Sequence, residues 1–425
     1  MNQVTDQQII EILRKEAVPA LGCTEPVACA LACAKCKEVL GSVPERLDVL
    51  VSGNIYKNGM GVGIPGTGMV GLPIAAALGA VCGKSEYGLE VLKEVNVGDN
   101  LQRAKDMLGQ VTVSLKEDAP DKLYAEALAT KGNDTVKVII AHTHTNIVLV
   151  EKNGEEIFKR EFRLDTSKPE DKGPELSVKR IWDFVHEVDV KDIEFVLQGA
   201  EMNKAISAEG LNSEYGLQIG KTLKENIDKG LLEDDLLNRT LIRATAASDA
   251  RMDGCPKPVM TNSGSGNQGI TVYLPVVAAE KFGASREQLA RALALSNLIA
   301  VHIHHYMGHL SALCGILIAG TGAASAITYL MGGTYDNMVN TIKTMCSNLT
   351  GMMCDGAKQG CALKVYSGVS AAVQAALLSM RGIKTNNDGI VEEDIERTIR
   401  NVGLIGTKGM EETDKTILNI MCNKK

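Results

Sequence analysis

Three cysteines in the C-terminal half of the chain could together hold a metal centre. Cys314 lies in SALCGILIAG, and Cys354 and Cys361 flank the short loop DGAKQG. Thiolates hold iron–sulfur clusters, and backbone amides that approach through glycine-rich loops tune the cluster sulfurs. Three thiolates would suit a cluster in which one iron lacks a protein ligand. The local spacing is neither the ferredoxin run nor a paired C-x-x-C zinc pattern, so three buried structural cysteines are an alternative interpretation.

A further cysteine could act as a base or a nucleophile. Cys23, in GCTEP at residues 22–26, precedes the predicted start of a helix. Free amides and the helix dipole stabilise a thiolate at such a position. An ionised Glu25 would oppose this effect. The alternative is that Cys23 is only a small buried residue.

The segment TNSGSGNQG, Thr261 to Gly269, is a candidate anion-binding loop. Its hydroxyls, amides and glycines could form a nest of hydrogen-bond donors for a carboxylate or phosphate. It lacks the lysine and the spacing of a Walker loop, and it does not match G-x-G-x-x-G after a strand. A structural turn is the alternative.

Histidines and a second glycine-rich run are weaker candidates. Residues 59–71 could form a ligand loop or could allow close packing of a helix on a sheet. HExxH is absent around the histidine-rich run HIHHYMGH, so we interpret its histidines, and the alternating pair on a predicted strand, as solvated or core residues. These histidines are His302, His304, His305 and His309 in the run, and His142 and His144 in the pair.

The elements that must position these residues indicate an α+β fold. A predicted amphipathic helix at residues 5–16 precedes a second helix over residues 24–40. Residues 46–165 combine strand periodicity with a small-residue helix, and Asn153–Gly154 is typical of a hairpin turn. The remaining chain is almost entirely helical in pattern.

We predict a mixed α/β domain and a large, mostly helical domain that carries the metal centre. Helices in residues 1–45 should pack on the helical domain, residues 178–425, so that Cys23 can reach the three cysteines. The α+β domain, residues 46–165, lies between them in sequence. Residues 166–177 are polar and rich in Pro, Lys and Glu, as in a linker.

Composition and charge limit the classes of protein. The 425 residues include 45 basic and 52 acidic ones, a net charge of −7, and no long basic block, which argues against nucleic-acid binding. Aromatic residues make up only 4%, too few for base-stacking platforms. The apolar runs are shorter than the ~20 residues of a membrane span, and no signal pattern is visible. We expect a cytoplasmic location, where the 11 cysteines stay reduced.

Together these motifs resemble the L-cysteine desulfidase family, which is related to the alpha chain of bacterial iron–sulfur L-serine dehydratases. The resemblance covers essentially the whole chain. The family's pattern of three cysteines is matched at Cys314, Cys354 and Cys361. The motifs that carry it are GCTEP at 22–26, SGNIYKNGMGVGIPGTGMVG at 52–71, KPVMTNSGSGNQG at 257–269, SALCG at 311–315 and CDGAKQGC at 354–361.

The resemblance implies a reaction and a role for each motif. The three cysteines would hold a [4Fe–4S] cluster whose fourth iron is left for substrate, and Cys23 would be the base. No pyridoxal phosphate is expected. The implied reaction is β-elimination of L-cysteine to pyruvate, ammonia and hydrogen sulfide. The implied binding residues for the substrate carboxylate are Ser263, Gly264, Ser265, Gly266 and Asn267.

Two other functions stay open. The same site could dehydrate L-serine, or a non-enzymatic protein could bind or sense a small amino acid with purely structural cysteines. We expect no nucleic-acid or membrane partner, and a homodimer is one option for assembly. Related dehydratases can use a C-terminal group as a displaceable iron ligand, but we interpret Cys422 as incidental. Cys255 lies close in sequence to the anion-binding loop and could intrude on the site.

Overall fold

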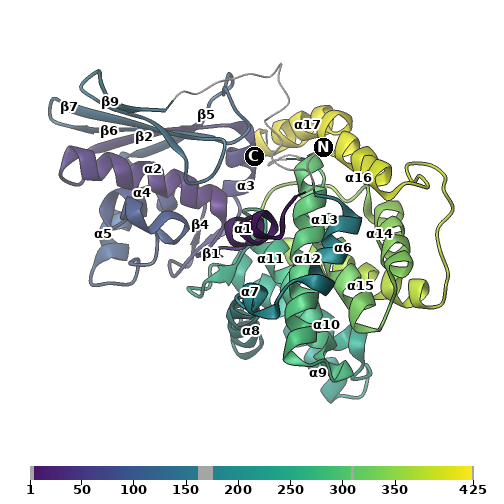
Figure 1. Cartoon of the computed structure of the whole chain (residues 1–425). Coiled ribbons are helices and arrows are strands. Elements are labelled where there is room, and N and C mark those ends of the chain that lie inside the picture. Colours follow the sequence, from purple (N-terminus) through teal and green to yellow (C-terminus); the bar gives the residue numbers. More distant parts are fainter. Residues whose placement is uncertain (1–3, 161–175, 308–310, 424–425) are drawn as a thin grey trace.

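A six-stranded mixed sheet and a larger group of helices make up the molecule (Figure 1). This computed structural model describes residues 4–160, 176–307 and 311–423, and the backbone alone for residues 277–279. The predicted α+β class is confirmed. Most of the predicted linker, residues 166–175, lies outside the described residues.

The sheet has the strand order β5-β2-β6-β7-β8-β9. β2 runs parallel to β5, and every other neighbouring pair is antiparallel. Asn153 and Gly154 join β8 to β9 with φ values of 53° and 85°, which confirms the predicted hairpin turn. The strands are β2 (Arg46–Val51), β5 (Val111–Leu115), β6 (Tyr124–Lys131), β7 (Asp134–Ala141), β8 (Ile147–Lys152) and β9 (Glu155–Lys159).

Helices made of small residues lie on one face of this sheet (Figure 1). α2 (Thr24–Leu40) and α4 (Leu72–Val81) pack so closely that a Cβ at Gly79 would lie 2.1 Å from the Ala30 carbonyl oxygen. Three cysteines of α2 are fully buried in the core between the helices and the sheet: Cys29, Cys33 and Cys36. The other elements here are α3 (Gly53–Gly59), β3 (Gly63–Ile64), β4 (Met69–Val70), η1 (Ser85–Glu90), α5 (Asn100–Asp106) and η2 (Leu108–Gln110).

The predicted grouping of residues 1–45 differs from the structure. α1 (Asp6–Glu16) is amphipathic and buries Ile9 and Leu13 among the helices of the larger part. α2 instead contacts β6 and β7, because small and apolar residues surround almost its whole length and the sheet buries them. The start of α2, where GCTEP lies, lines a cavity together with residues of the helical part.

The larger part is an assembly of helices around α12 (Arg286–Met307) and α13 (Ile316–Leu330). Glycines allow close contacts here too: a Cβ at Gly322 of α13 would lie 2.2 Å from the Ser296 carbonyl oxygen of α12. The other elements are α6 (Val178–Glu187), α7 (Val190–Ile193), α8 (Val196–Asn212), α9 (Ile219–Asp228), α10 (Leu236–Met252), α11 (Gly266–Ala278), η3 (Ala279–Phe282), α14 (Tyr335–Leu349), α15 (Cys361–Met380), α16 (Ile395–Leu404), η4 (Ile405–Gly409) and α17 (Glu411–Cys422).

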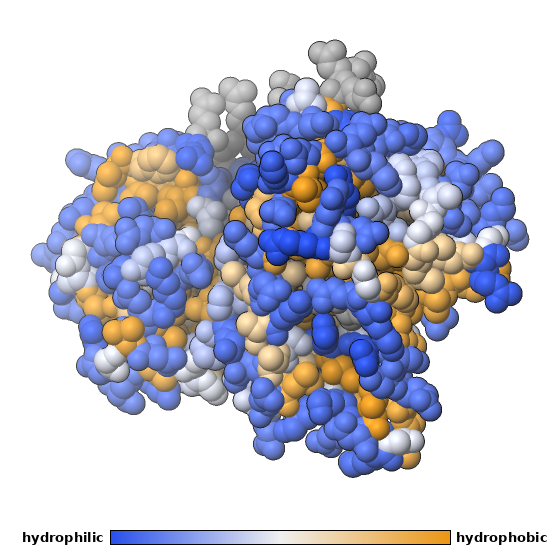
Figure 2. Space-filling model, turned by 60° about the horizontal axis from the view of Figure 1, so that its bottom comes forward, coloured by the Kyte–Doolittle hydropathy of each residue, from blue (hydrophilic) through white to orange (hydrophobic). Residues whose placement is uncertain are grey.

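Among the described residues, α15 is the one helix long and apolar enough to cross a membrane by length and composition alone, which the apolar runs in the sequence did not predict. Half of its most apolar segment is buried, and it packs against α10, α13 and α14. On the face drawn in Figure 2, hydrophobic residues form separate patches among hydrophilic ones. The burial of α15 and its contacts with the other helices are those of a helix in the core of the protein.

Candidate active site

A cavity of about 140 Å³ lies where the sheet part and the helical part meet. Cys23, Cys314, Cys354 and Cys361 all line it, together with residues of the anion-binding loop. Motifs that are far apart in the sequence therefore share one cavity.

A two-stranded pairing places Cys23 beside the anion-binding loop. β1 (Pro19–Ala20) runs antiparallel to β10 (Val259–Met260), just before the two motifs. The Thr261 amide donates to the Val18 carbonyl oxygen at 2.9 Å, which continues the pairing. Gly22 then turns the chain into α2 with a φ of 81°.

A second pairing aligns two of the three cysteines. Leu313 and Met353 form an isolated antiparallel bridge. The amide of Cys314 donates to the Met352 carbonyl oxygen at 2.8 Å, and the amide of Cys354 donates to Ala312 at 2.6 Å. These backbone contacts hold the segments before α13 and α15 side by side.

Four helices begin at this cavity. α2 starts after Cys23, α11 starts within the anion-binding loop, α13 starts after Gly315, and α15 starts at Cys361. Unpaired amides and the helix dipole favour negative charge at a helix N-terminus. The cavity is therefore suited to anionic groups such as thiolates and a substrate carboxylate.

The Cys23 thiol donates a hydrogen bond to Glu25. Its Sγ lies 3.1 Å from Glu25 Oε2, and both side chains are buried. Burial, with the Glu25 charge adding to it, raises the pKa of the Cys23 thiol well above its usual value, and Arg251 opposes this only in part. Burial and the Glu25 charge thus outweigh the predicted effect of the helix start on Cys23 and favour the protonated thiol.

Glu25 is held as a carboxylate inside the cavity. Burial would raise its pKa, but the nearby His144 and the hydrogen bond from Cys23 outweigh burial and lower that pKa. Asn58 Nδ2 also donates to Glu25 Oε1 at 2.9 Å. Cys23 and Glu25 form a buried thiol–carboxylate pair.

The anion-binding loop lines the cavity in a strained conformation. Ser263 has a φ of 49°, and its Oγ donates to the Asn262 side chain at 3.1 Å. Gly264, Ser265 and Asn267 also line the cavity, but Gly266 does not. A Cβ at Gly266 would lie 2.2 Å from Arg251 Nε, so this glycine makes room for the arginine.

Arg251 connects the two motifs that the β1–β10 pairing brings together. Its guanidinium donates to the Gly22 carbonyl oxygen at 3.1 Å and to Asn267 Oδ1 at 3.1 Å. Because Arg251 is buried in α10 and lines the cavity, it fixes the start of α2 relative to the loop.

Burial favours the protonated form of two of the three cysteines, Cys314 and Cys361. Burial raises the pKa of Cys314 to about 12, and the neighbouring Cys354 adds to this rise. Burial also raises the pKa of Cys361. Among the described residues, no three His, Cys, Asp or Glu side chains are arranged to hold a single metal ion. A thiol that coordinates a metal loses its proton outright, so Cys314 and Cys361 need a cationic centre to become thiolates.

Comparison with known proteins defines the family. A family model described as the serine dehydratase alpha chain matches residues 86–419, more than half of the chain. The chain belongs to this family. It is also similar to proteins named UPF0597, with 48% identity to one from Parabacteroides distasonis over the whole of both chains. The one from Oleidesulfovibrio alaskensis is 48% identical over 98% of each chain, and the one from Phocaeicola vulgatus is 46% identical over 99% of this chain and 98% of its own.

Several other residues singled out in the sequence of this serine dehydratase-like lyase lie outside the cavity lining. His302 instead contacts Glu396 at 2.7 Å, and Cys422 is exposed near the C-terminus. Cys255 and residues 59–71 do not line the cavity either. Within residues 59–71, a Cβ at Gly63 would lie 2.4 Å from the Asp253 backbone, so this glycine allows close packing. His305 is exposed, and His309 lies outside the described residues.

Sequence reasoning missed several residues of the cavity wall. The sequence pattern predicts a strand at His144, but β7 ends at Ala141 and His144 lies in the loop that follows, where it lines the cavity. Arg251 and Asp249 are the charged residues of the run ATAASDARM, whose other residues are mostly small, and charged residues in such a helix are a usable signal of a buried polar site. Asn58 and Lys364 also line the cavity without having been predicted, and Gln268 and His304 line it although neither was predicted to bind substrate.

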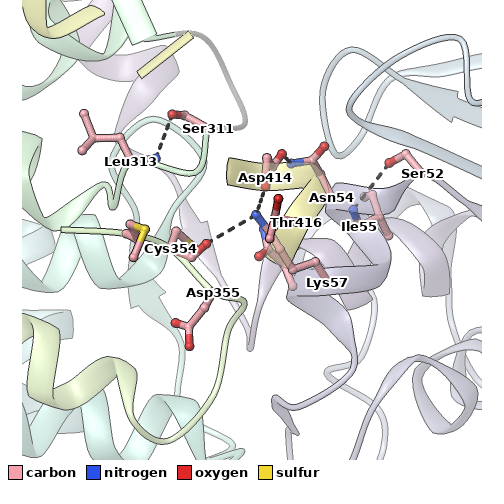
Figure 3. Close-up of polar contacts among 12 residues, drawn as sticks. Ser52, Asn54, Ile55, Lys57, Ser311, Leu313, Cys354, Asp355, Asp414 and Thr416 are labelled. Atoms are coloured by element: carbon pink, nitrogen blue, oxygen red, sulfur yellow. Dashed lines mark hydrogen bonds and ion pairs between the residues drawn. The ribbon is translucent and has the colours of Figure 1, made fainter. Parts of the chain in front are cut away.

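A buried ion pair supports the loop that carries Cys354. Lys57 of α3 is only 1% exposed and pairs with Asp414 of α17, and its Nζ also lies 3.5 Å from the Cys354 carbonyl oxygen (Figure 3). Asn54 Nδ2 donates to the same carboxylate at 2.7 Å. This contact joins the sheet part, the C-terminal helix and the cysteine loop.

Replacing Lys57 by methionine should therefore destabilise the protein. The substitution leaves Asp414 without its cation, and removing one partner of a buried pair costs about 3 kcal/mol. Urea unfolding followed by circular dichroism measures the effect. Lys415 is exposed on α17, the helix that carries Asp414. The control substitution Lys415→Met should change the unfolding free energy by less than about 0.5 kcal/mol. Equal midpoints for Lys57→Met and wild type would contradict the assigned role.

Proposed function

We propose that this serine dehydratase-like protein catalyses iron–sulfur-dependent β-elimination of L-cysteine to pyruvate, ammonia and hydrogen sulfide. One observation carries the proposal: Cys314, Cys354 and Cys361 line the same cavity as Cys23 in a chain of this family. The reaction class is that of a carbon–sulfur lyase.

The three cysteines fit a [4Fe–4S] cluster by their chemistry. All three are sulfur donors, the ligand type that selects iron–sulfur clusters, and Lys364 also lines the cavity near them. Two of them, Cys314 and Cys361, adjoin helix N-termini that favour the negative charge of a thiolate-bound cluster. When bound, the cluster would supply a Lewis acid that eases departure of the leaving group.

The cavity wall offers separate contacts for the two charged ends of an amino acid. Helix N-termini and the Ser263–Asn267 segment suit the carboxylate. Asn58 Oδ1 and Gln268 Oε1 are buried oxygens that line the same cavity and have no hydrogen-bond partner among the described residues. Two acceptors of this kind suit an ammonium group, because a buried oxygen without a donor is costly.

Cys23 would remove the Cα proton of the bound substrate. General bases contribute through their position next to the proton that they remove, and Cys23 lines the cavity. No pyridoxal phosphate is required in this scheme. We also propose a cytoplasmic location and a homodimeric assembly.

L-Serine is the second candidate substrate, because the family model that matches the chain is named for serine dehydratase. The experiment compares turnover of L-cysteine and L-serine by anoxically prepared protein, with pyruvate measured for both and sulfide for L-cysteine. We expect kcat/KM for L-cysteine to exceed that for L-serine. The reverse ratio would assign the protein as an L-serine dehydratase, and binding without turnover of either would favour an amino-acid-binding or sensor protein.

A further inference from the structure

The carboxylate of Glu25 is a buried charged group that the proposed reaction has not yet used. It contacts the Cys23 thiol at 3.1 Å, and Thr24 Oγ1 and Asn58 Nδ2 donate to it at 3.2 and 2.9 Å. These contacts fix the orientation of the carboxylate. The other titratable groups that line the cavity are His144, Arg251, His304, Lys364 and the three cysteines.

We propose that Glu25 accepts the proton of Cys23, so that the two residues act as one acid–base unit. This inference rests on the proposed function, because it adds a second catalytic group to the same elimination. Its geometric basis is a hydrogen bond that points from the Cys23 thiol to the Glu25 carboxylate, with no intervening group. A thiol must lose its proton before it can remove one from carbon.

The steps balance in protons and electrons. Glu25 first takes the Cys23 proton, and the thiolate then takes the Cα proton of the substrate. The electron pair of the Cα–H bond becomes the second bond between Cα and Cβ, and the bond from Cβ to sulfur breaks with its pair on the departing hydrosulfide. Glu25 then gives its proton to the hydrosulfide, which restores the Cys23 thiol and the Glu25 carboxylate.

The pair also explains why Cys23 does not cap α2. Its side chain makes no capping hydrogen bond although it occupies the N-cap position, because the thiol is directed to Glu25. Arg251 holds the preceding Gly22 carbonyl oxygen, which keeps the start of α2 in place. The helix start thus orients a proton donor and its acceptor in one turn.

The test compares wild-type protein with Glu25→Gln in two measurements. One is kcat for L-cysteine, and the other is the pH dependence of Cys23 alkylation by iodoacetamide, followed by mass spectrometry of the Cys23 peptide. Removal of the adjacent negative charge should move the alkylation profile to lower pH by about 1–3 units. At the same time kcat should fall about 10²–10⁴-fold, because the proton acceptor is lost.

The two measurements separate catalysis from a structural role. If Glu25 only opposes the thiolate, Glu25→Gln will shift the alkylation profile and keep or raise kcat, which would overturn the proposal. An unshifted profile would overturn it as well. Glu38→Gln, on the same helix but outside the cavity, should match wild type in both measurements. If wild type forms no pyruvate or sulfide, the proposed function fails, and the alkylation profile still decides whether Glu25 controls the Cys23 proton.

Discussion

Replacing Cys354 by alanine should abolish iron binding and lower kcat about 10³-fold. Cys354 lies on the loop before α15 and is only partly buried, so the substitution costs little packing. Loss of one of the three proposed thiolate ligands would remove the Lewis acid that the cluster would supply, a contribution of several kcal/mol to transition-state stabilisation, or about 10³-fold in rate. The measurements are iron content, the visible absorption of the anoxic protein, and kcat for L-cysteine.

Cys422→Ala is the matched control for Cys354→Ala. Cys422 is exposed at the end of α17 and does not line the cavity, so iron content and kcat should equal those of wild type. A Cys354→Ala protein that keeps iron and turnover would remove Cys354 from the set of ligands. Loss of iron from Cys422→Ala would instead show that the C-terminal cysteine is a ligand.

Replacing Cys23 by serine should lower turnover without loss of iron, because Cys23 is proposed as the base and not as a cluster ligand. A hydroxyl has a far higher pKa than a thiol, so kcat should fall about 10²–10⁴-fold, the usual contribution of a general base. Iron content should stay at the wild-type level, because the proposed ligands are the other three cysteines of the cavity. The measurements are kcat for L-cysteine and iron per chain on the same preparation.

Each alternative result for Cys23→Ser has a distinct meaning. Turnover within about twofold of wild type would show that another group removes the Cα proton, in contrast to the 10²-fold effect expected of a general base. Iron loss would instead indicate that the Cys23 thiol contributes to the cluster site. Thermal unfolding of the variant controls for a general loss of structure, since Cys23 is buried.

Local patterns in the sequence predicted individual helices, strands and turns better than they predicted which elements pack against one another. The strand periodicity after residue 46, the amphipathic helix predicted at residues 5–16 and the turn at Asn153–Gly154 follow from alternation, amphipathicity and turn chemistry, and the structure has β2 at Arg46–Val51 and α1 at Asp6–Glu16. The placement of α2 on the sheet did not follow. A helix that is apolar on all sides can be buried by either part, so only tertiary contacts decide its place.

The sequence indicated which residues line the cavity in part, but it did not indicate that the Cys23 thiol donates its proton in a hydrogen bond to Glu25. Family motifs indicated the cysteines and the anion-binding loop, whereas the Cys23–Glu25 hydrogen bond depends on burial and on contacts from elsewhere in the chain. His144 approaches from the loop after β7, and Asn58 from α3. Such contacts reverse the pKa shift that a helix start alone predicts for a thiol.

The central claim is that three cysteines from separate segments hold one iron–sulfur cluster beside Cys23. Iron and acid-labile sulfide content of the wild-type protein, purified without oxygen, tests this claim most directly. The proposed site predicts about four iron and four sulfide per chain. A folded protein that contains neither after anoxic purification and reconstitution would contradict it.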